Sequence, residues 1–140
     1  MKDLMNLIDV KRVISPVSEA GTTALVGQII DRQGFDSLTY VIATGSIADA
    51  DATFTVLLEE SADSGMSGAT AVADADLVGT EVLAAFQFDD DNEVRKLGYK
   101  GNLRYTRLTI TPVANASAAL ISAVAILGSP ALAPTANPPA

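Results

Sequence analysis

Acidic side chains are the groups in this sequence whose types and spacing could support chemistry. Two carboxylates roughly 5–9.5 Å apart across a cleft can hydrolyse a glycosidic bond. The candidates for such a pair lie in polar, turn-like segments: Asp49, Asp51, Asp89 and Asp91. The chain contains no histidine and no cysteine, so it lacks the usual base near neutral pH and any thiolate nucleophile. We therefore expect no catalytic residues and no enzymatic activity.

The same acidic segments contain oxygen ligands of the kind that calcium binds, about six to eight at a time. They read Asp-Ala-Asp at 49–51, Asp-Ala-Asp at 74–76 and Asp-Asp-Asp-Asn at 89–92. None has the spaced acids, central glycine and terminal glutamate of a calcium-binding loop, so acidic surface turns are the favoured interpretation. Residues 65–68, Gly-Met-Ser-Gly, lack the spacing and the lysine of a phosphate-binding loop. The sequence predicts no metal-binding residues and no cofactor.

The net charge of the chain is −8, from 17 acidic and 9 basic residues. A surface of that sign repels phosphate backbones and anionic lipid headgroups, so we expect neither a nucleic-acid nor a membrane partner. Most basic residues lie in two parts of the chain: Lys11 and Arg12, and then Arg95, Lys96, Lys100, Arg104 and Arg107. They could form a basic stripe that docks on an acidic protein or a neighbouring copy. Pairing with nearby acids is the alternative.

Short segments in which apolar residues alternate with polar ones occur along most of the chain, and this period of two predicts β-strands. The predicted strands cover residues 8–14, 22–30, 37–44, 53–60, 82–88, 93–99, 105–111 and 118–127. Ser15-Pro16 and Pro112 should end their strands, because proline lacks the amide donor of a ladder. The strands 82–88 and 93–99 should form a hairpin around the acidic turn.

Two further segments have a distinctive composition. Residues 61–76 are small and polar, which is typical of a surface loop with at most a brief strand. Residues 118–127 are apolar on both faces. This second pattern indicates a central strand or a strand pressed against another subunit, and a buried helix is the alternative.

About eight short strands at roughly 8–12-residue spacing predict an all-β fold, a single antiparallel β-sandwich. We expect a jelly-roll-like sandwich, with an immunoglobulin-like one as the alternative. The predicted organisation is an N-terminal arm at 1–7, the sandwich at 8–128 and a Pro/Ala-rich tail at 129–140, with both ends extended. The N-terminus lacks the apolar run of a secretory signal, and residues 118–127 are half the roughly 20 residues of a membrane helix. We expect a soluble protein.

Three stretches of the sequence resemble small structural proteins of tailed-bacteriophage and prophage virions. They are IDVKRVISPV near the start, QIIDRQGFDSLTYVIATGSIADADATFTVLLEES in the middle, and GYKGNLRYTRLTITPVAN before the apolar strand and Gly128. The resemblance covers residues 8–128. Because these stretches are turns and framework strands, they indicate kinship better than they indicate a role.

The resemblance implies a non-enzymatic virion component, most like a head decoration or capsid cement protein. Such a protein lies on the capsid surface and bridges subunits of the major capsid protein, after synthesis in the host bacterial cytoplasm. Proteins of this kind often form homotrimers, and the ends at 1–6 and 129–140 would reach neighbouring subunits. The alternatives are a tail, connector or spike-associated virion protein and, from another class, a calcium-dependent glycan-binding module.

Overall fold

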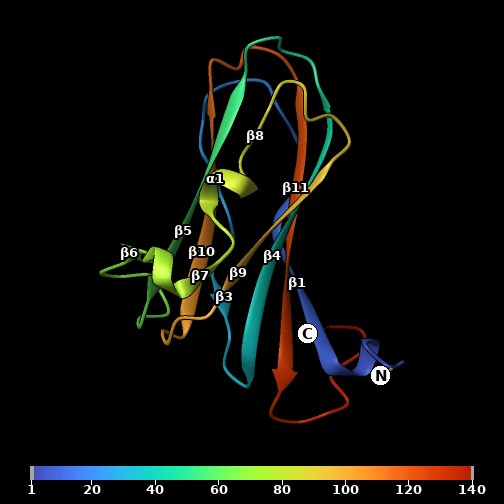
Figure 1. The fold of residues 1–140 in the computed structure, drawn as a ribbon, viewed down its shortest axis with the longest axis vertical. Helices are drawn as coiled ribbons and strands as arrows, with labels where there is room; N and C mark the ends of the chain where they lie inside the picture. The colour runs from blue at the N-terminus through green and yellow to red at the C-terminus, as the bar shows by residue number, and fades with distance from the viewer. Residues whose placement is uncertain (1, 140) are drawn as a thin grey trace.

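In the computed structural model, which describes residues 2–139, the chain folds into two antiparallel β-sheets packed face to face (Figure 1). Sheet A contains, in spatial order, β1 (Ile8–Glu19), β11 (Ala119–Pro130), β4 (Phe35–Ile47), β9 (Val94–Tyr99) and β7 (Leu77–Val78). Sheet B contains β2 (Leu25–Val26), β10 (Tyr105–Val113), β5 (Thr53–Ser61) and β6 (Thr70–Ala71), with β3 (Ile30–Asp31) on β10 and β8 (Phe86–Gln87) on β5. The short helical turns of the described residues are η1 (Met5–Leu7), η2 (Asp74–Asp76) and α1 (Glu81–Ala84).

The order in which the strands pair is that of a jelly roll. The first strand pairs with the last, β1 with β11; β2 and β3 pair with β10, β4 pairs with β9, and β5 pairs with β6 and β8. Nested pairing of this kind folds the chain into two sheets. The prediction of an all-β antiparallel sandwich is confirmed. The strand order is that of the predicted jelly roll and not that of the immunoglobulin-like alternative.

Aliphatic side chains from both sheets fill the space between them. Along β11 every second side chain from Ala119 to Leu127 is buried, and β10 shows the same alternation. The rings of Phe54 and Phe86 stack in this core with centroids 4.7 Å apart. Burying each leucine, isoleucine or phenylalanine stabilises the fold by about 1.5–3 kcal/mol relative to leaving it in water, so the interior of the sandwich holds the two sheets together.

A buried hydrogen bond joins the two sheets within this core. The hydroxyls of Tyr40 on β4 and Thr106 on β10 lie 2.6 Å apart, and both residues are fully buried. Burial raises the pKa of Tyr40 well above its usual range, because a phenolate would lose its hydration there. Sliding one sheet over the other would leave a buried hydroxyl without a partner, so this bond fixes their relative position.

A second bond between the sheets lies near the start of β10. Tyr99 on β9 donates to a carboxylate oxygen of Glu60 on β5 at 2.6 Å, and Tyr99 is 3% exposed. The Tyr99 hydroxyl also accepts from the backbone N–H of Leu103 at 3.1 Å, and the guanidinium of Arg32 lies 5.3 Å from the ring centre. Burial, together with the bond to the Glu60 carboxylate, raises the pKa of Tyr99 to about 12. The cluster ties the loop before β10 to both sheets.

Two prolines do not end their strands, so those predicted boundaries are wrong. β1 runs through Pro16 to Glu19. It is the outermost strand of sheet A, and its register shifts twice between Arg12 and Val17. Proline is tolerated at sheet edges and bulges, because no ladder bond is lost there. β10 likewise includes Pro112, and beyond Ile110 this strand has a neighbour on one side only.

The segment predicted as a strand at 82–88 begins as the short helix α1. Thr80 caps it: the side-chain oxygen accepts from the backbone N–H of Leu83 at 3.1 Å, as N-cap residues do. The Glu81 carboxylate accepts from the N–H of Leu58 at 2.8 Å and so covers the edge of β5 between β6 and β8. The extended part, β8, pairs with β5 and not with β9. The predicted hairpin is therefore wrong.

The segment predicted as one strand at 22–30 is divided into β2 and β3 around Gly27. A β-carbon at Gly27 would lie 2.6 Å from the carbonyl oxygen of Leu108 and 2.7 Å from Val13, and the Gly27 N–H donates to that same oxygen at 2.7 Å. Only glycine allows the backbone to approach this closely. Residues 61–76 form a loop with the brief strand β6, as predicted, and 118–127 is a central strand rather than a helix.

The bond between Tyr40 and Thr106 predicts a specific pattern of stability changes. Tyr40→Phe and Thr106→Val should each lower the free energy of unfolding by about 1–3 kcal/mol, because each leaves one buried hydroxyl unpaired. The double variant removes both hydroxyls and should cost clearly less than the sum. Urea denaturation of the four proteins measures this coupling, and costs that simply add would contradict a shared bond.

The raised pKa of Tyr99 predicts a loss of stability at alkaline pH. A group with a raised folded-state pKa stabilises the fold below its unfolded pKa, about 10 for tyrosine, and loses that contribution as the pH rises through the folded value, here about 12. The free energy of unfolding should therefore fall between pH 10 and 12, and it should fall less steeply in Tyr99→Phe. Denaturation curves at stepped pH test this, and identical slopes in both proteins would contradict it.

Candidate functional site

The acidic residues that the sequence singled out for chemistry shape turns. A carboxylate oxygen of Asp49 accepts from the backbone N–H of Ala116 at 2.7 Å and another from that of Asp51 at 3.2 Å. Asp91 accepts from the N–H of Ile47 at 2.9 Å, and Asp90 pairs with Arg95 at 2.9 Å. These bonds hold loops against strand ends, and the carboxylates of Asp49 and Asp91 are engaged with backbone amides of two different segments.

Asp49 and Asp51 are the two acids whose carboxylates meet. Their mutual hydrogen bond lowers the pKa of Asp49, which the N–H groups of Ala116 and Asp51 lower further. The same bond and the nearby charge of Asp49 raise the pKa of Asp51. Both side chains lie at the surface, and among residues 2–139 no group of three or more acidic side chains is placed to hold a metal ion.

The basic residues do not form the single stripe that the sequence suggested. Arg104, just before β10, pairs with Asp31 of β3 at 2.8 Å, and Arg107 of β10 pairs with Glu59 of β5 at 3.2 Å. Arg95 pairs with Asp90 and with Glu93. Local pairing, the alternative interpretation, therefore describes these three arginines. Lys11 pairs with Asp9 at 3.3 Å, and Lys100 is exposed just beyond the end of β9. Arg12 on β1 and Lys96 on β9 are both exposed on sheet A.

The outward side of sheet A, which we call face A, is the most unusual surface of the molecule. Its side chains alternate with the buried ones: Val10 and Arg12 on β1, Leu120, Ser122, Val124 and Ile126 on β11, Thr39, Val41 and Ala43 on β4, Val94 and Lys96 on β9, and Val78 on β7. Five of the aliphatic side chains are 40–63% exposed: Val10, Val124, Leu120, Val78 and Val94. None of these outward positions holds a carboxylate.

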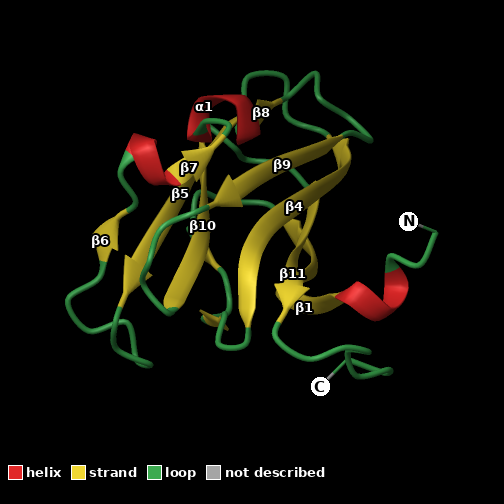
Figure 2. Ribbon diagram, turned by 60° about the horizontal axis from the view of Figure 1, so that its bottom comes forward, coloured by secondary structure: helices red, strands yellow, loops and turns green. Residues whose placement is uncertain are grey.

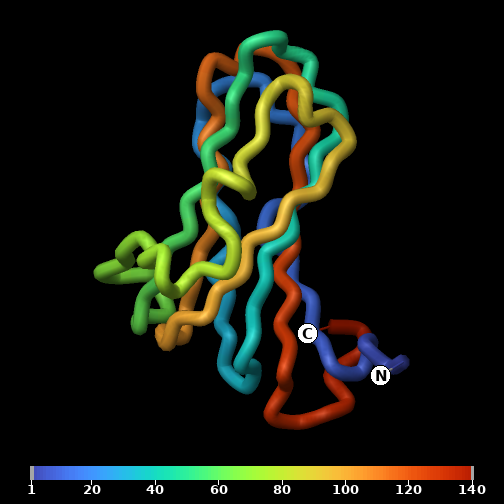
Figure 3. Tube along the Cα trace, in the orientation of Figure 1, coloured from blue at the N-terminus to red at the C-terminus, as the bar shows by residue number. Residues whose placement is uncertain are grey.

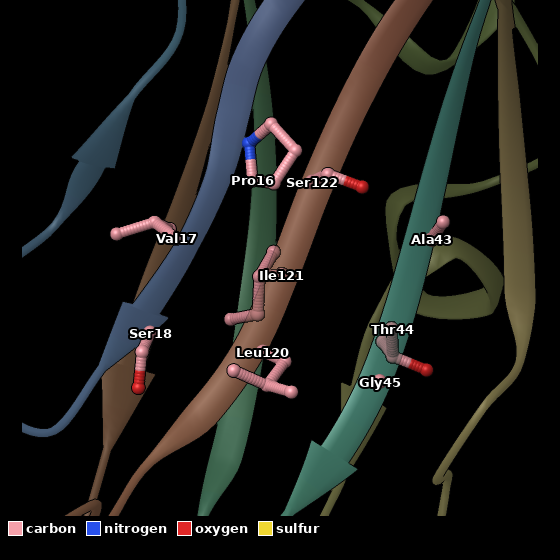
Figure 4. Close-up of a pocket in the computed structure, with 9 residues that line it drawn as sticks. All are labelled: Pro16, Val17, Ser18, Ala43, Thr44, Gly45, Leu120, Ile121 and Ser122. Carbon is pink, nitrogen blue, oxygen red and sulfur yellow. The ribbon is translucent and has the colours of Figure 1, made fainter.

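Two glycines allow aliphatic side chains of face A to lie close to the backbone of the sheet. A β-carbon at Gly45 would lie 2.8 Å from the β-carbon of Leu120, and one at Gly98 would lie 2.9 Å from that of Val78. Each glycine thus makes room for an aliphatic side chain of the neighbouring strand to lie flat on the sheet. A shallow hollow of about 320 Å³ remains beside Leu120, between β1, β11 and β4 (Figure 4). Flat aliphatic sheet surfaces of this kind pack well against another protein surface.

The two chain ends meet at one end of the sandwich (Figures 2 and 3). The Thr135 N–H donates to the carbonyl oxygen of Asn6 at 3.0 Å, and its hydroxyl donates to that of Ile8 at 2.5 Å. An apolar cavity of about 460 Å³ lies between the two ends, lined by Leu4, Met5, Ile8, Val10, Ala136, Asn137 and Pro139. The prediction was two extended arms. Instead, β11 continues to Pro130 and the following residues fold back onto the N-terminal segment.

The described residues contain no helix that is long and apolar enough to cross a membrane.

Comparisons with known proteins find similarity at the level of three-dimensional structure. Neither a family model nor a curated protein sequence matches the chain. The SPBc2 prophage-derived protein YomS is 12% identical, with a TM-score of 0.47, and the match covers 89% of this chain and 99% of that one. The CBM22-1–GH10 modules of Clostridium thermocellum xylanase 10B, solved with xylohexaose, are also 12% identical with a TM-score of 0.47, over 95% of this chain and 28% of that one.

The C-terminal family 22 carbohydrate-binding module of the same xylanase is 10% identical, with a TM-score of 0.38, over 94% of this chain and 92% of that one. At these identities and TM-scores the similarity carries no argument about role, because one sandwich architecture serves many unrelated functions.

Sequence reasoning identified only part of face A: it predicted that residues 118–127 could be pressed against another subunit, but not that the neighbouring strands extend this surface. The signal was present, because residues 37–44 and 118–127 are apolar on both faces. Such strands are expected to be covered on both sides, and only the strand order shows that one side of β4 and β11 is left open. The fold-back of the C-terminal residues had no signal, since it depends on Thr135 finding backbone carbonyls 127–129 residues away in the chain.

The contact between the chain ends predicts how Thr135 controls their mobility. Thr135→Val removes the hydroxyl and should speed amide exchange about fivefold in residues 4–8 and 131–139, because a bond worth about 1 kcal/mol is lost. Thr135→Ser keeps the hydroxyl and should leave exchange unchanged. Hydrogen exchange read by mass spectrometry measures both, and equal exchange in the valine variant and the wild type would contradict this role.

Proposed function

We propose that this chain is a non-enzymatic structural protein of a tailed-phage virion, located on the capsid exterior where it bridges major capsid protein subunits. Face A is the observation that carries this proposal. Monomeric soluble proteins rarely leave a wide, contiguous aliphatic surface uncovered, and such surfaces mark interaction sites. The sequence resemblance of residues 8–128 to phage virion proteins supplies the setting in which this surface is used.

Other properties of the molecule suit an assembly role. Two hydrogen bonds between the sheets, Tyr40–Thr106 and Tyr99–Glu60, fix the relative position of the outer surfaces. Four of the aromatic side chains, Tyr40, Phe54, Phe86 and Tyr99, are buried in the core and are not exposed for stacking on sugars. Asp49 and Asp91 bind backbone amides in turns.

The oligomeric state, the partner and the place of synthesis are part of the same proposal. A decoration protein is used in many copies set by the symmetry of the shell, and a homotrimer fits the local three-fold positions of a capsid. The partner is the major capsid protein, and synthesis takes place in the host bacterial cytoplasm. A position in the tail, the connector or a spike is the alternative within the same class.

The location of the chain in purified particles tests the proposal. Immunogold labelling, with quantitative mass spectrometry of the copy number, should find many copies spread over the head. A few copies at one vertex or on the tail would favour the alternative virion position, and absence from particles would overturn the proposal. Sedimentation of the purified protein, alone and on isolated heads, measures its oligomeric state, and a strict monomer in both conditions contradicts the trimer.

A glycan array with and without calcium serves as the control for the other function class. No binding and no calcium-dependent rise in melting temperature are expected. Calcium-dependent binding to a defined glycan would replace the structural role by that of a carbohydrate-binding module.

A further inference from the structure

We propose that face A docks on a protein surface of defined chemistry: an apolar strip flanked by two carboxylates about 14 Å apart. This inference rests on the proposed function, within which that surface belongs to the viral shell. It goes further by naming the chemical groups of the partner that must face this surface.

One cross-strand row of face A specifies these groups. Arg12 pairs in register with Val124, Val124 with Val41, and Val41 with Lys96. The row therefore reads cation, valine, valine, cation across four adjacent strands. Neighbouring strands lie roughly 4.8 Å apart, so three steps place the two cationic positions about 14 Å apart.

Charge on this row is not balanced within the molecule. Among residues 2–139 neither Arg12 nor Lys96 forms an ion pair with a carboxylate; Arg12 instead donates to the Ser15 hydroxyl at 2.8 Å. The chain as a whole carries a net charge of −8, yet the outward positions of sheet A hold these two cations and no acid. Complementary charges across an interface set the register and suppress wrong partners. A partner with carboxylates opposite Arg12 and Lys96 satisfies both.

The same charges argue against two other occupants. A second copy docked face A to face A would gather four cations and no carboxylate in one dry layer, which is costly. The carboxylates of Asp49 and Asp91 already bind backbone amides. An anionic membrane attracts clusters of basic residues, whereas this face has two isolated ones on a molecule of net charge −8.

The test compares two variants with the same change in net charge. In Arg12→Glu/Lys96→Glu the reversed charges lie on face A, and in the control Lys2→Glu/Lys100→Glu they replace exposed lysines elsewhere. Each protein is added to phage heads purified from a strain that lacks the gene for this chain. The bound copies per head are counted by quantitative mass spectrometry, and circular dichroism confirms that each variant is folded.

We expect the wild type and the control to bind alike and the face A variant to bind at least about tenfold more weakly. Val124→Ser should also weaken binding, while Leu57→Ser, a matched change on the outward side of sheet B, should not. Binding by the face A variant that equals that of the control would overturn this inference and leave the proposed function standing. Failure of the wild type to bind heads would overturn both.

Two further readouts identify a different occupant. Sedimentation of the wild type as an oligomer that Arg12→Glu/Lys96→Glu dissociates would show that a second copy covers face A. Co-flotation of the wild type with phosphatidylglycerol vesicles, lost in the same variant, would show a membrane partner. Either result would overturn the inference.

Discussion

The alternation of side chains along β11 is the constraint on which the rest of the structure depends. This strand is hydrogen-bonded to β1 on one edge and to β4 on the other, so it cannot rotate about its own axis. Every second residue from Ala119 to Leu127 is committed to the core, and Leu120, Val124 and Ile126 are committed to the outside. One short sequence thus specifies both the interior of the sandwich and the centre of face A.

Hydrogen bonds between the sheets fix the relative position of the two layers, which aliphatic packing alone does not fix. Aliphatic packing has little directional preference and tolerates small shifts of one layer over the other. The Tyr40–Thr106 and Tyr99–Glu60 bonds do not, because each joins a donor and an acceptor on different sheets at 2.6 Å. The outer surfaces of the two sheets are therefore held in a fixed relative position.

The fold class was predictable from the sequence because alternation is a local property that survives in the folded chain. Residues 53–60 and 118–127 are strands as expected. The errors arose where distant partners decide the conformation. α1 depends on Thr80 as a cap and on Glu81 reaching the amide of Leu58, and β1 passes Pro16 because it lies at an edge. Face A follows from strand order, which alternation does not encode.

The meeting of the chain ends has a consequence for engineering. Residues near both termini lie side by side at one pole of the sandwich, whereas the hollow beside Leu120 lies along the middle strands of sheet A. Adjacent ends are the arrangement in which circular permutation and genetic fusion are tolerated. A peptide or enzyme fused to either end would be carried at the same pole, so this protein offers a display scaffold with one attachment point, which borders face A at Val10 and Ile126.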